Sequence, residues 1–397
     1  MKLHRIPFLV QKMIVEELGF DERLFLTIAS KRTCSLIRKF KVDLDSISIT
    51  VRTNEICVFV RKDLWDSITF SIPFHKCQME HSSAWNIGGS IVRVRKAFRD
   101  IMEFSLNDDR FDTTRNAVTV FGILLRHLKS FSNIRKPMQC SFRTIPVGFI
   151  FALDCGFVFN NIEIQTTPIE SVTPEELKVL LENVQTELLR LNVKVQSVHD
   201  YKYLRNPDKE RSIYRLIIGN HSWVDFSELP AAKVISISKQ IPLNQMNMVL
   251  KSWVAGRNRD MEIGDFEIGK FSDLNREIIF ADVERHPSQI TEKEIDAFFC
   301  QANNLPSRRF MGNIISVDIL REGDGLRATV METAHDTYPG SKLRRNHPNI
   351  LPRTINMIYE IDRTTDDRRA ALVLDAQKIL ILAWADRRIA KLQGLRT

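Results

Sequence analysis

Recognisable catalytic and metal-binding motifs are absent from this sequence of 397 residues. It contains no Gly-x-Ser-x-Gly elbow, no His-Glu-x-x-His pair, no P-loop and no protein-kinase signature. Its six cysteines are scattered and form no Cys-x-x-Cys pair, which argues against a zinc finger or a disulfide scaffold. These absences do not by themselves exclude an enzyme, but we expect no cofactor and no bound metal, and the scattered cysteines suit a reducing compartment such as the cytoplasm or the nucleus.

Long apolar runs are missing as well. No stretch approaches the roughly 18 apolar residues that a membrane-spanning helix needs. The apolar N-terminal run is broken by Gln11 and Lys12, so we expect no signal peptide. The net charge of +8 is a moderate basic excess that is compatible with acidic partners or nucleic acid and demonstrates neither. The clearest basic clusters, 342–347 and the C-terminal tail, are interpreted as a solvated loop and a frayed helix, so nucleic acid is not an expected partner.

The first forty residues predict three short helices. Pro7 suits the first turn of a helix over 7–18, Gly19 suits its C-terminal cap, and Asp21 suits the N-cap of a second helix. A third helix is expected from about Thr33.

Apolar residues of the first helix fall on several of its sides rather than on one stripe. They form three arcs, namely Pro7, Val10, Ile14 and Leu18; Leu9 and Met13; and Phe8 and Val15. A segment of about 40 residues cannot cover such a helix by itself. These helices must therefore either pack into the rest of the chain or present a surface to another protein.

The same residues resemble the F-box, the helical segment by which substrate receptors dock on the Skp adaptor of cullin-based ubiquitin ligases. The residues that carry the resemblance, and that it implies contact the adaptor, are Ile6, Pro7, Val10, Ile14, Leu18, Leu24, Ile28, Ser30, Lys31 and Arg32. The sequence of this segment is similar to that of the large nematode F-box families, although Ile6 stands where Leu is commoner. The alternative is an ordinary helical hairpin that belongs to the main core.

After the helices the pattern changes to short strands, at 46–51, 55–60 and 67–72, followed by an amphipathic helix over 114–131. Between them, Trp85 is expected in a loop. His127, on the helix, is expected at the surface or half-buried rather than as a ligand. His75, Cys77 and His81 lie close in sequence, but no fourth ligand is near, so we do not predict a metal site there.

Residues 147–271 alternate strands and helices at spacings typical of leucine-rich repeats. Strands are expected at 161–165, 189–195, 213–218, 234–238 and 261–268, with a capped helix after Thr173 and another over 243–255. Because the repeat consensus is poor, the prediction is an LRR-like arrangement in which stacked units form a curved solenoid. A generic layered α/β domain is the alternative.

This region also resembles the F-box-associated domain type 2, which follows such F-boxes in nematode proteins. The motif residues are Trp223, Trp253, Gly256 and Asn258, and the strand after Asn258 departs from the usual leucine-rich pattern. Gly256 would permit a left-handed cap after the helix.

The sequence thus predicts a mixed α/β (α+β) protein in four segments. These are an F-box at 1–42, a linker unit at 43–145 with short strands and one long helix, an LRR-like β/α region with a mixed sheet at 146–275, and a β-hairpin-rich extension at 276–397. The resemblances imply a non-catalytic substrate-recognition adaptor of an SCF-type ubiquitin ligase. Its expected partners are a Skp-family adaptor, through it a cullin, and an unknown protein substrate, with no membrane involved. The alternative function is a non-ligase interaction scaffold with an LRR-like binding face.

Overall fold

The computed structural model describes residues 5–63, 66–75, 81–87, 89–97, 101–106, 113–154, 156–164, 171–196, 200–209, 212–258, 260–261, 263–268 and 277–283, and the backbone of the C-terminal strands β17–β21. The chain is a mixed α/β protein with extensive mixed β-sheet, as the sequence predicts. It divides into two compact units, Met1–Ser197 and Val198–Thr397. The finer division into four segments stays a prediction.

Three short helices open unit 1: α1 (Phe8–Glu17), α2 (Phe20–Ala29) and α3 (Lys31–Lys39). Their ends differ from the predicted ones. Gly19 caps the start of α2 rather than the end of α1, because its N–H donates to Glu22 Oε2 at 2.8 Å. Ser30 caps α3, accepting from the Thr33 N–H at 3.1 Å, so this helix begins two residues before Thr33.

The sheet of unit 1 has the strand order β12–β10–β9–β2–β3–β4–β7–β6–β5. Its strands are β2 (Ser46–Val51), β3 (Glu55–Arg61), β4 (Ser67–Pro73), β5 (Ser83–Ile87), β6 (Ser90–Lys96), β7 (Ile101–Leu106), β9 (Met138–Phe142), β10 (Val158–Ile164) and β12 (Gln185–Leu191). The pairs β2–β9, β9–β10 and β10–β12 are parallel. Shorter parallel pairs join β1 (Val42–Leu44) to β8 (Ser132–Ile134) and β11 (Ser171–Val172) to β13 (Lys194–Val195).

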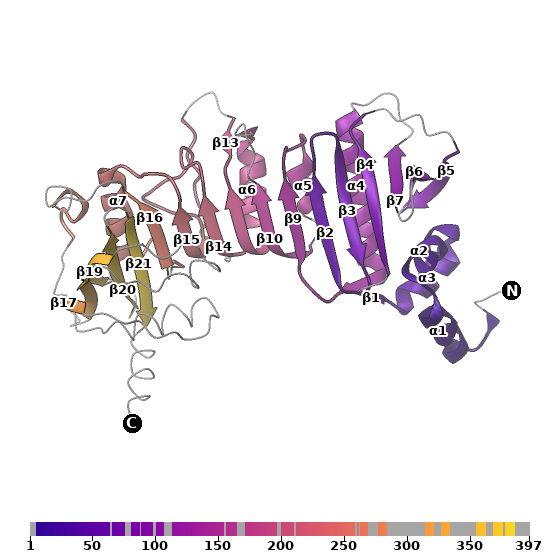
Figure 1. Cartoon of the computed structure of the whole chain (residues 1–397), viewed down its shortest axis with the longest axis horizontal. Coiled ribbons are helices and arrows are strands. Elements are labelled where there is room, and N and C mark those ends of the chain that lie inside the picture. The colour runs from indigo at the N-terminus through magenta and orange to yellow at the C-terminus, as the bar shows by residue number, and fades with distance from the viewer. Residues whose placement is uncertain are drawn as a thin grey trace. The chain divides into compact units, whose positions relative to one another are not determined.

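Helices α4 (Thr113–Phe131), α5 (Phe149–Leu153) and α6 (Pro174–Glu182) lie together behind this sheet in the view of Figure 1. Alternate side chains of each strand point toward them, so that Ile47, Ile49 and Val51 of β2 are buried. The core of unit 1 therefore lies between one face of the sheet and one layer of helices.

Two local expectations in unit 1 are wrong. Trp85 lies in strand β5, which forms a hairpin with β6 around Gly89 (φ +93°), rather than in a loop. The single strand expected at 189–195 is divided between two strands: Leu189–Leu191 end β12, which pairs with β10, and Lys194–Val195 form β13, which pairs with β11.

Unit 2 contains the parallel strands β14 (Ile213–Ile218), β15 (Ala232–Ile237) and β16 (Ile263–Glu267), with α7 (Leu243–Val254) between the last two. Strand β16 pairs antiparallel with β21 (Lys378–Ala385), which continues through β20 (Arg368–Asp375) to β19 (Ile355–Asp362). A separate antiparallel pair joins β17 (Ile314–Leu320) to β18 (Arg327–Thr333). The parallel strands thus give way to antiparallel ones within this unit.

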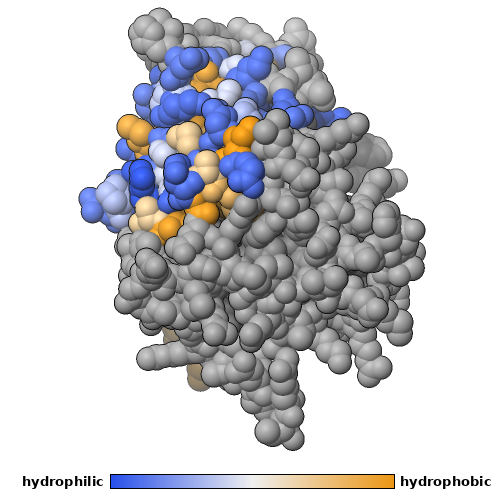
Figure 2. Space-filling view, turned by 90° about the vertical axis from the view of Figure 1, so that its left-hand side faces the viewer, coloured by the Kyte–Doolittle hydropathy of each residue, from blue (hydrophilic) through white to orange (hydrophobic). Residues whose placement is uncertain are grey.

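Exposed large apolar side chains are few among the described residues of unit 2: Leu204, Met248 and Ile278. Among the residues that Figure 2 colours, hydrophilic and hydrophobic side chains are intermingled. Apolar exposure is therefore scattered over the described part of unit 2, and the contiguous apolar surface of the described residues has to be sought in unit 1.

Candidate docking surface on the N-terminal helices

Helix α1 exposes large apolar side chains on its outer side. Leu9 is 71% exposed, Met13 65%, Phe8 58% and Val10 42%. Leu9 and Met13 are four residues apart and Val10 and Met13 three, so their side chains adjoin on the helix surface. We call Leu9, Val10 and Met13 the α1 ridge.

The opposite side of α1 is covered. Val15 is fully buried, and Gln11 and Ile14 are half-buried on the same side of the helix. Phe8, which shares an arc with Val15, is 58% exposed, and its ring packs on the ring of Phe40 just after α3, with 5.0 Å between centroids. The ridge is therefore a single surface on a helix whose other side already belongs to the fold.

Helices α2 and α3, by contrast, are packed against the α/β body. Phe20 at the start of α2 is fully buried and stacks on Phe131 of α4, with 6.2 Å between ring centroids. Ile37 of α3 is fully buried, and Arg38 Nε donates to Ser130 Oγ of α4 at 3.2 Å. These two helices therefore form a base that carries α1.

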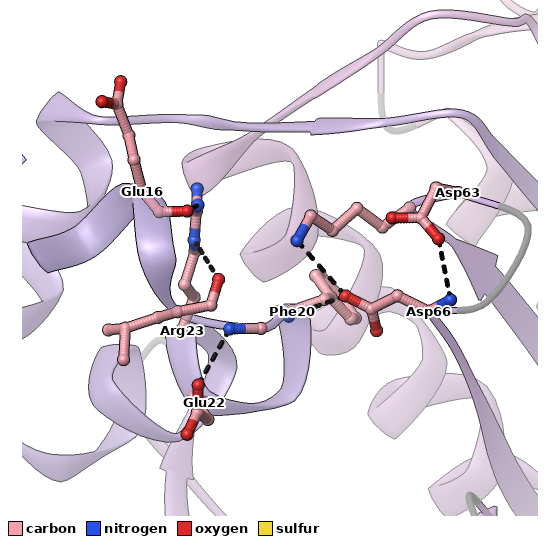
Figure 3. A network of polar contacts seen from close by, with 9 residues as sticks. Glu16, Phe20, Glu22, Arg23, Asp63 and Asp66 are labelled. Carbon is pink, nitrogen blue, oxygen red and sulfur yellow. Dashed lines mark hydrogen bonds and ion pairs between the residues drawn. The ribbon is translucent and has the colours of Figure 1, made fainter. Parts of the chain in front are cut away.

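A buried arginine joins α1 to this base. Arg23 of α2 donates from Nη2 to the carbonyl of Glu16 at 2.8 Å and from Nε to the carbonyl of Leu18 at 3.1 Å (Figure 3). The carbonyls at a helix C-terminus have no partner within the helix, and a cation also complements the helix dipole there. Burial lowers the pKa of Arg23, while the nearby charges of Glu16, Asp66 and Asp43 oppose that shift.

The start of α2 is fixed to the β3–β4 loop by a carboxylate. Asp66 Oδ2 accepts from the backbone N–H of Phe20 at 3.2 Å and lies 3.4 Å from Lys62 Nζ (Figure 3). A carboxylate at a helix N-terminus accepts from a free N–H and complements the positive end of the dipole. The position of α2 on the sheet is thus set by charge as well as by burial.

A buried histidine connects α2 with α4. Thr27 Oγ1 donates to the carbonyl of Leu24 at 2.6 Å, so it accepts from His127 Nε2 at 2.8 Å and the proton of the neutral ring is on Nε2. Burial, with a smaller contribution from the charge of Arg38, lowers the pKa of His127 to about 4. The expectation that His127 is at the surface or half-buried is therefore wrong, because only 4% of its surface is exposed.

The residues that the F-box resemblance selects fall in three environments. Pro7, Val10, Ser30, Lys31 and Arg32 are exposed; Ile6, Ile14, Leu18 and Ile28 are half-buried; and Leu24 is 1% exposed. Leu24 therefore supports the helices from within. The most exposed ridge residues, Leu9 and Met13, lie on the second apolar arc of α1, and the three-arc pattern was the only sequence signal for them.

A second surface is the face of the unit 1 sheet that points away from α4. Strand pairing aligns two rows of its side chains: Arg190, Glu163, Ser141, Thr50, Cys57 and Ser71, and next to it Leu188, Asn161, Gln139, Ser48, Phe59 and Thr69. The first row combines hydroxyl groups with the charges of Arg190 and Glu163, the second is mainly hydroxyl and amide, and Phe59 contributes an aromatic ring. Such a face can form hydrogen bonds to a polypeptide.

The motif residues of unit 2 have structural contacts. Trp223 and Trp253 are buried, and Trp253 Nε1 donates to the carbonyl of Met261 at 3.3 Å. Gly256 has φ +76°, the left-handed conformation predicted for it after α7. Asn258 Oδ1 accepts from the Leu229 N–H at 2.8 Å. These residues hold the turn after α7 and the segment before β15 together.

No group of three or more His, Cys, Asp or Glu residues placed to hold a metal occurs among the described residues. Cys77, the nearest approach to a Cys–His pair in the sequence, lies outside them. Burial and the nearby Glu55 raise the pKa of the Cys57 thiol to about 11, so at neutral pH this thiol is protonated and a poor nucleophile.

Comparisons with known proteins do not assign the chain to a family. No family model, no curated protein and no solved structure matches it. Within the described residues, no helix combines the length and the apolar character needed to cross a membrane. The surfaces themselves must therefore support any functional proposal.

Proposed function

We propose that this chain is a non-catalytic substrate receptor of an SCF-type ubiquitin ligase, with α1–α3 as an F-box that docks on a Skp-family adaptor and through it on a cullin. The observation that supports it most is the α1 ridge, three exposed apolar side chains that adjoin on a helix that the rest of the chain holds in place. Contiguous apolar exposure of this kind marks a surface that another protein covers.

The remainder of the chain presents the substrate in this proposal. In unit 1, β9, α5 and β10 and then β10, α6 and β12 form successive parallel β–α–β units, and in unit 2 β15, α7 and β16 do the same. This alternation supports an LRR-like arrangement in which the helix-free face of the sheet binds a protein substrate. Ubiquitin transfer itself would take place on a conjugating enzyme held by the cullin, and the receptor would raise the local concentration of the substrate. On this proposal the chain works in the cytoplasm or the nucleus.

The test is binding of the full chain to a purified Skp adaptor, with Leu9→Ser and Met13→Ser combined. Both side chains are more than half exposed, so the fold should change little. Losing two apolar anchors of about 1.4 kcal/mol each should weaken binding about 100-fold.

A matched control removes exposed apolar residues elsewhere in unit 1, with Val147→Ser and Phe151→Ser. The control should bind the adaptor like the wild type. Equal binding by the ridge variant and the wild type would contradict the proposed docking surface. If the chain binds a protein substrate but binds neither the adaptor nor a cullin, the result would favour the alternative function, a non-ligase scaffold.

A further inference from the structure

The charges around the α1 ridge differ in sign between its two ends. Helix α1 has ten residues and is therefore about 15 Å long. The Phe8–Phe40 contact places its first turn against the end of α3, where Lys39 and Lys41 are exposed, and Arg5 is exposed just before α1. The N-terminal end of the ridge is therefore basic.

Acidic side chains occupy the other end. Glu16 and Glu17 close α1, and Asp21 and Glu22 follow in the first turn of α2; all four are exposed. Of these, Glu16 lies 3.7 Å from Lys12 within α1. The helix dipole adds to the same polarity, since its positive end coincides with the basic end of the ridge.

Neighbouring acidic residues do not cancel the charge of the basic end. Asp43, two residues beyond Lys41, already accepts a hydrogen bond from Arg135 at 3.1 Å. Asp45 is paired with Arg61 and Lys136. Within the described residues, no ion pair involves Lys39 or Lys41, so their charges face solvent.

From this layout we infer the chemistry of the partner: a protein with an apolar groove that carries acidic residues where it receives the start of α1 and basic residues where it receives the α1–α2 turn. The inference rests on the proposed function, and it adds the direction in which α1 lies in the groove. A nucleic acid or an anionic membrane is negative throughout and would be repelled by Glu16, Glu17, Asp21 and Glu22. Opposite charges at both ends speed association and set orientation more than they raise affinity.

The experiment measures the rate constant for association of the full chain with an immobilised Skp adaptor, in low and high salt. One variant reverses the basic end (Lys39→Glu with Lys41→Glu) and another the acidic end (Glu16→Lys with Glu17→Lys). Each should associate about 10-fold more slowly in low salt and like the wild type in high salt, because salt screens exposed charges. The control Lys178→Glu with Lys194→Glu, on exposed residues of α6 and β13, should behave as the wild type.

The outcomes separate the two proposals. If the wild type binds the adaptor and both reversals associate like the control, the inferred charge pattern is overturned and the proposed function stands. If the wild type does not bind the adaptor, both proposals fail. Binding of the wild type to vesicles of phosphatidylserine and phosphatidylcholine, lost on reversing the basic end alone, would assign the surface to a membrane and overturn the inference.

Discussion

Helix α1 and the pair α2–α3 are adjacent in the sequence but differ in how far their apolar side chains are buried. The apolar residues of α2 and α3, such as Phe20 and Ile37, are buried against the α/β body, whereas Leu9 and Met13 of α1 face outward. The difference is one of partners: α2 and α3 pack on α4, whereas α1 is held by buried Val15, by the Phe8–Phe40 contact and by Arg23. A helix can thus be fixed in position while its apolar face is left free for another molecule.

The largest loss of stability should come from removing a buried side chain between α2 and α4. Phe20→Ala removes a fully buried ring stacked on Phe131 and should lower the free energy of unfolding by about 3–5 kcal/mol. Leu9→Ala, on the ridge, should cost less than about 0.5 kcal/mol. Urea denaturation of the full chain measures both, and equal costs would remove the distinction between base and ridge.

Low pH should lower the free energy of unfolding, because His127 is buried between α2 and α4 in its neutral form. The pKa of His127 is about 4 in the folded chain, against 6.5 for a solvent-exposed histidine, so below pH 6.5 the unfolded chain binds a proton that the folded chain does not. Stability that is present above pH 6.5 is then lost progressively and is gone below about pH 4, a difference of about 3 kcal/mol. Denaturation curves at several pH values measure it.

The matched variant is His127→Gln, whose amide can still donate to Thr27. It should abolish this part of the pH dependence between 6.5 and 4 while leaving the contributions of the carboxylates. An unchanged pH profile in His127→Gln would mean that the buried ring does not couple α2 to α4 in this way.

A smaller, local effect should follow from Arg23→Met. The change removes the hydrogen bonds to the Glu16 and Leu18 carbonyls and should favour local opening of α1 by about 2 kcal/mol. Amide hydrogen exchange should accelerate in α1 and stay slow in α2 and α3. Faster exchange throughout all three helices would show that α1 is not an independent element.

Much of the secondary structure could be predicted because local signals agree with the fold. Strands at 46–51 and 213–218 match β2 and β14, and the Thr173–Glu176 capping box starts α6 as expected. Strand β9 was missed even though Met138, Cys140 and Phe142 alternate, since five residues give a weak signal. Its pairing with both β2 and β10 depends on distant segments that no local pattern reveals.

The candidate surface was only partly predictable for the same reason. Periodicity showed that α1 has too many apolar sides for its own segment to cover. Which side is covered depends on Arg23 and Phe40, whose contacts arise only when three helices meet. The burial of Leu24 and His127 likewise follows from docking on α4, which residue spacing within one helix cannot disclose.

The most direct test of the central claim, that the α1 ridge is covered by another protein, is thiol labelling of Met13→Cys in the full chain with and without the Skp adaptor, read by peptide mass spectrometry. Val147→Cys, exposed elsewhere in unit 1, serves as the reference site. The account predicts that the adaptor slows labelling at position 13 by at least about 10-fold and leaves position 147 unchanged. Equally fast labelling at position 13 in an adaptor-bound chain would contradict it.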